Sequence, residues 1–304
     1  MSESKRSTLE PLVQPFMDYL QFEKRYSVHT IRSYRDDLAQ FFDFIQVQFG
    51  EVALPEISSS FVRSWLAALK DRGLSSRSIN RKISTLASFY KYHLRSGAVE
   101  QSPMRAITSP KVNKRLPVYV EQQDTTALFT GIEFPDSWEG RTDRLLLAIF
   151  YHTGMRLSEL VNLREQQVDS SNRSIKVLGK GNKERIIPVS PILVEAVQAY
   201  IREKRQQLEN PDTTYLLVGK TGKKLYAQYV YRAVRKYLSQ VTTIDKKSPH
   251  VLRHTFATHL MNSGAELNSV KELLGHSSLA ATQVYTHNTI GKLKEIYQKA
   301  HPKA

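Results

Sequence analysis

Four polar side chains near the end of the chain have types and spacings suited to phosphate chemistry. His250 and Arg253 lie three residues apart in SPHVLRHTFATHL, so a helix there would project both from one face. His276 follows in LLGHSS, and Tyr285 follows in TQVYTH. Arginine forms paired hydrogen bonds with phosphate oxygens, histidine gains and loses protons near neutral pH, and a phenol is a candidate nucleophile. The stretch therefore predicts a site that acts on a phosphodiester.

Short helices must position these four side chains. Ser248 is a good N-cap for a first helix, which residues 263–264 would end. A second, over residues 270–274, would stop at Gly275, because glycine suits the left-handed conformation after a helix. A third would carry Tyr285. Closely connected helices of this kind would gather the four side chains.

The same stretch resembles the catalytic end of tyrosine recombinases, most nearly those of the Xer type. The shared features are H-x-x-R, then LLGHS, then a tyrosine nine residues after that histidine. The resemblance covers essentially the whole chain and adds an arginine in TGMRLSEL and a lysine in GKGNKE. Taken alone, the arginine would pair with Glu159 on the surface, and the lysine would be an ordinary turn residue. The resemblance instead implies a site of six residues: Arg156, Lys180, His250, Arg253, His276 and Tyr285.

The chemistry that the resemblance implies is transesterification of DNA. Tyr285 would attack a scissile phosphate, leaving a 3′-phosphotyrosyl link and a free 5′-hydroxyl. A phenol with a pKa of about 10 needs a base, and His250 is the candidate. The two arginines would clamp the non-bridging oxygens, and His276 would donate a further hydrogen bond. Lys180 would protonate the leaving 5′-oxygen, and the resemblance implies no cofactor, metal or ATP.

The resemblance also implies partners. It predicts four protomers on two palindromic sites in double-stranded DNA, acting alone or with a paralogous recombinase, and leaves room for a septal DNA translocase. Resolution of chromosome or plasmid dimers at cell division is the leading function. The alternatives are an integrase or invertase of a mobile element, a type IB topoisomerase, and a non-catalytic DNA-binding regulator.

Composition agrees with a partner that is a polyanion. The 304 residues carry 44 Lys and Arg against 29 Asp and Glu, a net charge of +15 that is spread along the chain rather than held in one tail. Cysteine is absent, which excludes disulfides, thiolate nucleophiles and Cys-ligated zinc. Neither an apolar run long enough for a membrane span nor a signal-peptide core is present, so we expect a cytoplasmic protein.

Apolar periodicity predicts a mainly α protein with a small β-sheet, of the α+β class. Residues 1–107 predict an N-terminal bundle of four helices, which the resemblance equates with a SAM-like core-binding domain. Residues 108–117, TSPKVNKRLP, predict a basic linker. Residues 118–304 predict the mixed catalytic domain, and the resemblance implies that the two domains clamp DNA. An amphipathic tail over residues 290–300 would fold back on its own domain or dock on another protomer.

Within the second domain, the run LLLAIF at residues 145–150 predicts a buried helix that Gly154 would end. Two β-branched runs, SIKVL and RIIPV, flank a Gly-Asn turn and predict a β-hairpin. Further helices are expected at residues 122–129, 194–208 and 228–238.

Basic side chains beside these elements are candidate DNA contacts, although a solvated face or tether would look similar. They lie at two helix starts of the bundle, in the linker and on the helix at residues 228–238: Arg32, Arg35, Arg77, Arg81, Lys82, Lys111, Lys114, Arg115, Arg232 and Arg235.

Two other interpretations of the final stretch are weaker. His250 and His254 have the spacing of a metal pair, but the glutamate of H-E-x-x-H is missing and no third ligand stands out, so His254 is interpreted as structural. Residues 268–287 could form a helix-turn-helix, but a regulator would have no need of the three basic residues at 156, 180 and 253. No Walker loop is present, so no nucleoside triphosphate is expected.

Overall fold

The computed structural model describes most of the chain, in three stretches: residues 10–112, 118–179 and 184–275. The chain divides into two units, Met1–Arg115 and Leu116–Ala304, at a point inside the predicted linker. Within the described residues, no helix is both long and apolar enough to cross a membrane.

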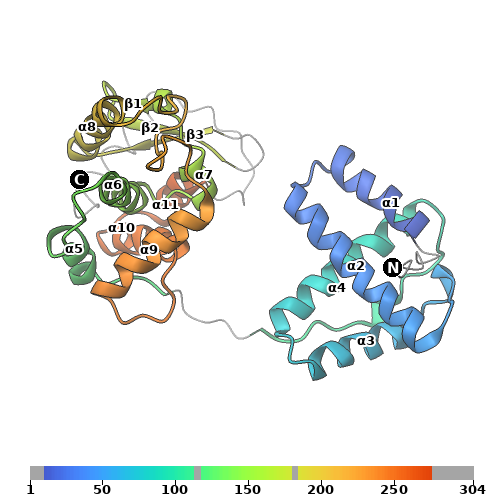
Figure 1. Cartoon of the computed structure of the whole chain (residues 1–304). Helices are drawn as coiled ribbons and strands as arrows, with labels where there is room; N and C mark the ends of the chain where they lie inside the picture. The colour runs from blue at the N-terminus through green and yellow to red at the C-terminus, as the bar shows by residue number, and fades with distance from the viewer. Residues whose placement is uncertain (1–9, 113–117, 180–183, 276–304) are drawn as a thin grey trace, which may run out of the picture. The chain divides into compact units, whose positions relative to one another are not determined.

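The first unit is a bundle of the four predicted helices (Figure 1): α1 Glu10–Asp18, α2 Val28–Phe49, α3 Ser59–Asp71 and α4 Ser76–Arg95. A single π-helical turn, Tyr19–Glu23, extends the first helix. Ser27 and Ser75 cap α2 and α4, because each hydroxyl accepts the backbone N–H three residues on. Buried aromatic rings fill the bundle, with Phe41 edge-on to Trp65 at 5.0 Å between ring centroids.

The second unit combines a small sheet with seven α-helices among its described residues: α5 Gln122–Thr130, α6 Trp138–Thr153, α7 Leu157–Val161, α8 Pro191–Gln207, α9 Ala227–Val241, α10 Pro249–Asn262 and α11 Leu267–Leu274. The sheet is antiparallel in the order β1 Val168–Asp169, β2 Ser174–Leu178 and β3 Glu184–Pro188. The predicted hairpin is confirmed as β2 and β3, with Ile175 opposite Ile187. The two-residue β1 was not predicted.

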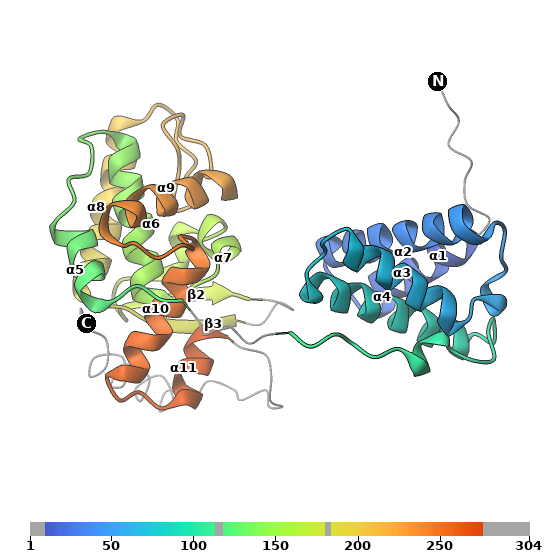
Figure 2. The ribbon, with the colours of Figure 1, turned by 90° about the horizontal axis from the view of Figure 1, so that it is seen from below.

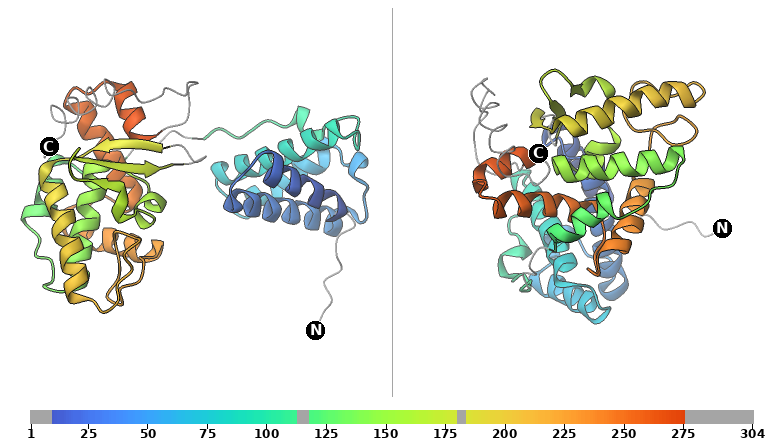
Figure 3. Two further views of the ribbon diagram at one scale, coloured as in Figure 1. Left: turned by 90° about the horizontal axis from the view of Figure 1, so that it is seen from above. Right: turned by 90° about the vertical axis from the view of Figure 1, so that its left-hand side faces the viewer.

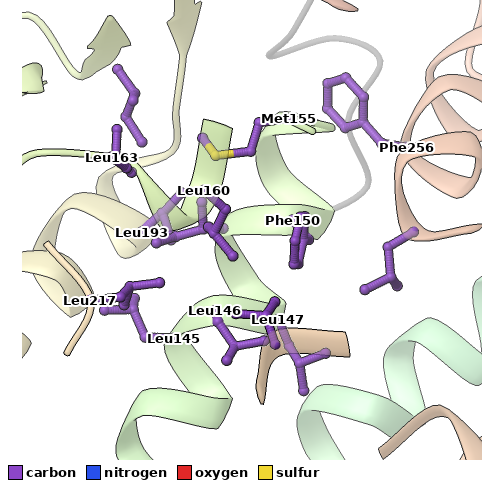
Figure 4. Close-up of a cluster of buried hydrophobic side chains, with 14 of the residues drawn as sticks. Leu145, Leu146, Leu147, Phe150, Met155, Leu160, Leu163, Leu193, Leu217 and Phe256 are labelled. Atoms are coloured by element: carbon purple, nitrogen blue, oxygen red, sulfur yellow. The ribbon is translucent and has the colours of Figure 1, made fainter. Parts of the chain in front are cut away.

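Helix α6 runs through the core of this unit. It starts earlier than its apolar run, because the Ser137 hydroxyl caps it by accepting Gly140 N–H, and it ends where Gly154 takes the left-handed conformation at φ 56°. Side chains on several sides of it are buried, including Leu146, Leu147 and Phe150 (Figure 4). The predicted helix over residues 145–150 is thus confirmed as the element against which α8, α9 and α10 pack.

Two further arrangements matter for the site. Helices α10 and α11 lie side by side next to the hairpin, and α11 contacts β3 (Figures 2 and 3). Val120, which follows the linker closely, is fastened to α10 at both of its backbone groups. Its N–H donates to Thr255 Oγ1 at 2.9 Å, and its carbonyl lies 3.0 Å from His259 Nε2.

Candidate active site

Three of the six predicted site residues lie in the described part of the chain: Arg156, His250 and Arg253. Lys180, His276 and Tyr285 lie outside the described residues, as do the predicted DNA contacts Lys114 and Arg115.

Arg156 is the N-cap residue of α7, directly before its first turn. Glu159, in that turn, bonds to both the backbone N–H and the side chain of Arg156. The Arg156 N–H donates to Glu159 Oε2 and its Nη1 to Glu159 Oε1, both at 2.7 Å. The pairing with Glu159 is therefore present, but it is not a surface pair, because the Glu159 side chain is only 4% exposed. The Arg156 side chain stays 33% exposed, and its Nη2 donates to the Gly275 carbonyl at 2.9 Å.

Arg253 is buried in α10. Its Nη1 donates to the Gly154 carbonyl at 2.7 Å and its Nη2 to the Leu274 carbonyl at 2.6 Å. Burial and the neighbouring guanidiniums of Arg156 and Arg185 lower the pKa of Arg253 to about 10, so it remains charged at neutral pH.

His250 and Arg253 lie three residues apart on α10, as predicted, but they differ in environment. Arg253 is drawn inward by carbonyls of two other segments, whereas His250 is exposed on the first turn of α10. The His250 ring packs edge-on against that of His254 at 4.6 Å between centroids. Burial lowers the pKa of His254, and the nearby charges of His250 and Arg253 lower it further, so the neutral form is favoured. Within the described ranges no group of three side chains could hold a metal ion.

Arg185 is a site neighbour that the sequence analysis missed. It is buried on β3, with its Nη1 and Nη2 donating to the two oxygens of Glu159 at 2.9 and 2.7 Å. Its Nε donates to the Leu273 carbonyl at 2.8 Å. A signal was available, because alternation along β3 places this arginine on the same face as buried Ile187, and a buried cation requires a partner.

The end of α11 is held by all three arginines. Its last carbonyls and that of the capping residue lie beyond the reach of helical hydrogen bonding. Leu273 is bonded by Arg185, Leu274 by Arg253 and Gly275 by Arg156. Cations are also favoured at the negative end of a helix dipole. The backbone is therefore fixed at the residue that precedes position 276.

The charges of this cluster do not cancel. Arg156 and Arg185 bond to the Glu159 carboxylate, and Arg253 lies near enough to interact with its charge, so three guanidiniums against one carboxylate leave 3 − 1 = +2. Burial alone would raise the pKa of Glu159, but hydrogen bonds and charge from Arg185, with hydrogen bonds from Arg156, lower it to about 2. Glu159 is thus ionised at neutral pH, and the surplus positive charge suits an anion such as a phosphodiester.

Comparisons with known proteins place this chain in a family. Residues 120–291 match the phage integrase family, and residues 13–97 match the phage integrase N-terminal SAM-like domain. The chain is 38% identical to tyrosine recombinase XerC of Chlorobaculum parvum, covering 96% of this chain and 94% of the relative. It is 40% identical to tyrosine recombinase XerC of Oceanobacillus iheyensis, covering 97% of both. This chain is a tyrosine recombinase of the phage integrase family.

Solved structures share the fold of this tyrosine recombinase. One is the XerH site-specific recombinase bound to its difH substrate, with a TM-score of 0.71 at 21% identity, covering 97% of this chain and 94% of that one. Another is the Tn1549 transposon integrase in complex with circular intermediate DNA, with a TM-score of 0.68 at 20% identity, covering 92% and 98%. The family and these relatives identify the recombinase as a DNA-binding, DNA strand-exchange enzyme, as the sequence motifs predicted.

The predicted DNA contacts of the recombinase differ in accessibility. Seven lie exposed in the described stretches: Arg32, Arg35, Arg77, Arg81, Lys111, Arg232 and Arg235. Lys82 is different, because its Nζ is buried against Asp37 Oδ1 at 2.8 Å and Gln40 Oε1 at 2.6 Å. This corrects the prediction for Lys82, whose ammonium is held inside the bundle rather than offered to a phosphate.

Proposed function

We propose that Tyr285 is the nucleophile of this recombinase and that the arginine cluster holds the scissile phosphate beside it. The observation that supports the proposal is the surplus of two positive charges around Glu159, at the end of α11 and immediately before His276. A guanidinium has five N–H donors, and Arg253 uses two of them on carbonyls. Arg156, one-third exposed, and Arg253 would bind the non-bridging oxygens as charge develops on them.

The remaining roles follow from the chemistry of each group. His250, exposed on α10, accepts the phenolic proton as Tyr285 attacks phosphorus. Lys180 delivers a proton to the departing 5′-oxygen, and His276 donates to a non-bridging oxygen. The P–O5′ bond breaks as the P–O bond to tyrosine forms, so the phosphodiester energy is conserved. The 5′-hydroxyl of a partner duplex then reverses the step.

In the cell, the recombinase resolves chromosome or plasmid dimers in the cytoplasm. The support is the match along nearly the whole length of two relatives named XerC. The working assembly is a tetramer on two palindromic duplex sites, formed with itself or with a paralogue. A septal DNA translocase is a candidate activator.

Covalent trapping tests the nucleophile. The protein is mixed with nicked duplexes carrying candidate palindromic sites, in chelator and without ATP, and the products are separated under denaturing conditions. We expect a covalent protein–DNA band from the wild type and from Tyr231→Phe, an exposed tyrosine of α9, but none from Tyr285→Phe. A gel shift confirms that all three bind DNA. A band from Tyr285→Phe of undiminished intensity would refute the assignment.

A further inference from the structure

We propose that Arg185 is a positioning residue for strand cleavage: it sets the orientation of the Arg156 guanidinium and the place where α11 ends. The inference rests on the proposed function, because it assigns Arg156 to the scissile phosphate. Arg185 lies on β3 and bonds to two other elements, α7 through Glu159 and α11 through Leu273. Its side chain is only 4% exposed, and its Nε, Nη1 and Nη2 all donate to protein acceptors, so it acts through these neighbours and not on DNA.

The first step of the argument is the sharing of Glu159. Its Oε1 accepts from Arg156 Nη1 at 2.7 Å and from Arg185 Nη1 at 2.9 Å. Its Oε2 accepts from the Arg156 backbone N–H and from Arg185 Nη2, both at 2.7 Å. The two-pronged contact with Arg185 fixes the plane of the carboxylate. Because the carboxylate is held in one plane, the partly exposed guanidinium of Arg156 must adopt one orientation to pair with it.

The second step is the contact with the end of α11. Arg185 Nε donates to the Leu273 carbonyl. A β-carbon added at Gly275 would lie 3.1 Å from Arg185 Cδ and 3.2 Å from its Nη1, so this side chain lies directly against the Gly275 backbone. The carbonyl of Gly275 is the one that Arg156 bonds. Both anchors of the Arg156 guanidinium, Glu159 and Gly275, therefore rest on Arg185.

Lys204 supplies the comparison for a cation with only a structural role. It is fully buried in α8, and its Nζ donates to the carbonyls of Asp212 and Tyr215 at 2.8 and 2.7 Å. It also pairs with Glu165 at 2.5 Å. These contacts tie a loop to α8 and include none of the groups that anchor Arg156. Loss of Lys204 thus disturbs folding through the same chemistry but leaves the cluster intact.

The principal variant is Arg185→Lys in the full-length protein. Lysine keeps a positive charge beside buried Glu159, but its single ammonium cannot reproduce the planar fork and the separate Nε contact. The measurement is the single-turnover cleavage rate on a nicked duplex, at saturating protein and well below each melting temperature. We expect Arg185→Lys to cut roughly 100-fold more slowly, because small misplacements of a positioned group have effects of that size.

Lys204→Met is the matched control. We expect it to melt at a lower temperature and still to cut near the wild-type rate. Both variants should bind the duplex with nearly wild-type affinity, because neither side chain is exposed to DNA. A near-wild-type rate for Arg185→Lys would overturn the proposal. An equal loss for Lys204→Met would overturn it too, because a general loss of rigidity would then be the cause.

A substrate with sulfur at the bridging 5′ position identifies the affected step. A thiolate leaves without the proton that an alkoxide needs, because thiols have a pKa of about 8.5. This substrate should rescue Lys180→Ala but leave Arg185→Lys slow, since phosphate clamping is the impaired step. Rescue of Arg185→Lys would overturn the proposal. Covalent capture by Tyr285→Phe would instead refute the proposed function, so the two failures are distinguishable.

A double variant covers the case in which Arg185→Lys folds poorly. Glu159→Gln with Arg185→Met removes both buried charges together, which buried ion pairs commonly tolerate. We expect it to fold and to cut no faster than Glu159→Gln alone, because Arg185 acts on Arg156 through Glu159. Wild-type cleavage by the double variant would overturn the proposal.

Discussion

Among the described residues, each unit has a cluster in which a buried carboxylate lies among basic side chains, and the two clusters differ in what else those cations bind. In the first unit, Asp37 of α2 pairs with Arg81 and Lys82 of α4 and accepts from Thr85 Oγ1 at 3.0 Å. The Lys82 ammonium also donates to Gln40 Oε1, and it lies 5.6 Å from the centre of the Trp65 ring. This cluster joins neighbouring helices mainly through side chains, with one longer contact from Arg81 Nη1 to the Ser33 carbonyl at 3.5 Å.

In the second unit, the cations around Glu159 also donate to main-chain carbonyls. Those carbonyls belong to Gly154 and to residues 273–275, where helices end beside the proposed site. The comparison shows that a buried ion pair does not by itself indicate function. The two clusters differ in their acceptors, because the first joins side chains of two helices, whereas the second also binds carbonyls at helix ends beside the proposed site.

The largest effect we predict is on the first cluster. Asp37→Ala leaves the Lys82 ammonium buried without its carboxylate, which should lower the free energy of unfolding of the N-terminal unit by about 3–5 kcal/mol. Urea unfolding measures this through Trp65 fluorescence in a Trp138→Phe background, because the chain has two tryptophans, one in each unit.

Asp36→Ala is the control for that experiment. Asp36 neighbours Asp37 on α2 but is exposed, so its removal should change the free energy of unfolding by less than about 0.5 kcal/mol. Equal effects of the two substitutions would show that burial of the ion pair does not matter, and the comparison of the clusters would lose its basis.

The next effect concerns pH and the second cluster. The folded protein holds the pKa of Glu159 at about 2, against an ordinary 4.5, so the unfolded chain takes up this proton first as pH falls. The stabilisation is complete above about pH 4.5 and is lost as pH falls towards 2. Between these limits, the stability difference between wild type and Glu159→Gln should shrink by roughly 3 kcal/mol.

Urea unfolding at a series of pH values, followed through Trp138 in a Trp65→Phe background, measures that difference. Glu195→Gln, at an exposed position of α8, is the control for replacing a glutamate that is not buried among arginines. If the stability difference between wild type and Glu159→Gln did not vary with pH, the lowered pKa of Glu159 in the folded protein would be contradicted.

The smallest effect separates backbone strain from contact with the cluster. Gly275 has φ 63° and Gly264 has φ 89°, so alanine at either should cost about 1–2 kcal/mol in stability. A β-carbon at Gly264 meets no atom within 4 Å, whereas one at Gly275 crowds Arg185. We therefore expect only Gly275→Ala to slow single-turnover cleavage. Equal cleavage rates for the two variants would show that the Arg185 contact is dispensable.

Sequence patterns predicted most of the helices and the hairpin, because apolar spacing and caps are local signals. They failed where a cation lies on an apolar face. Lys82 stands in the buried stripe of Ile79, Ile83 and Leu86, and Arg185 stands on the core face of β3. Lys82 was assigned by its charge and Arg185 was given no role, although the position of each in the periodic pattern was the better guide.

The cluster itself could not be assembled from the sequence. Arg156 was expected at the site from its motif, and its proximity to Glu159 followed from helical spacing. The convergence of three arginines on successive carbonyls depends on how β3, α7, α10 and α11 pack, and no local pattern encodes such distant contacts. Strand β1 was missed because two residues carry no alternation.

The attachment of Val120 to α10 has a mechanical consequence. A pull along the linker reaches the catalytic unit at Val120, whose two backbone groups are tied to Thr255 and His259. The load therefore enters through the helix that also carries His250 and Arg253. Because α10 packs against α6, tension in the linker would act on the helix that carries two proposed site residues and, through it, on the core of this unit.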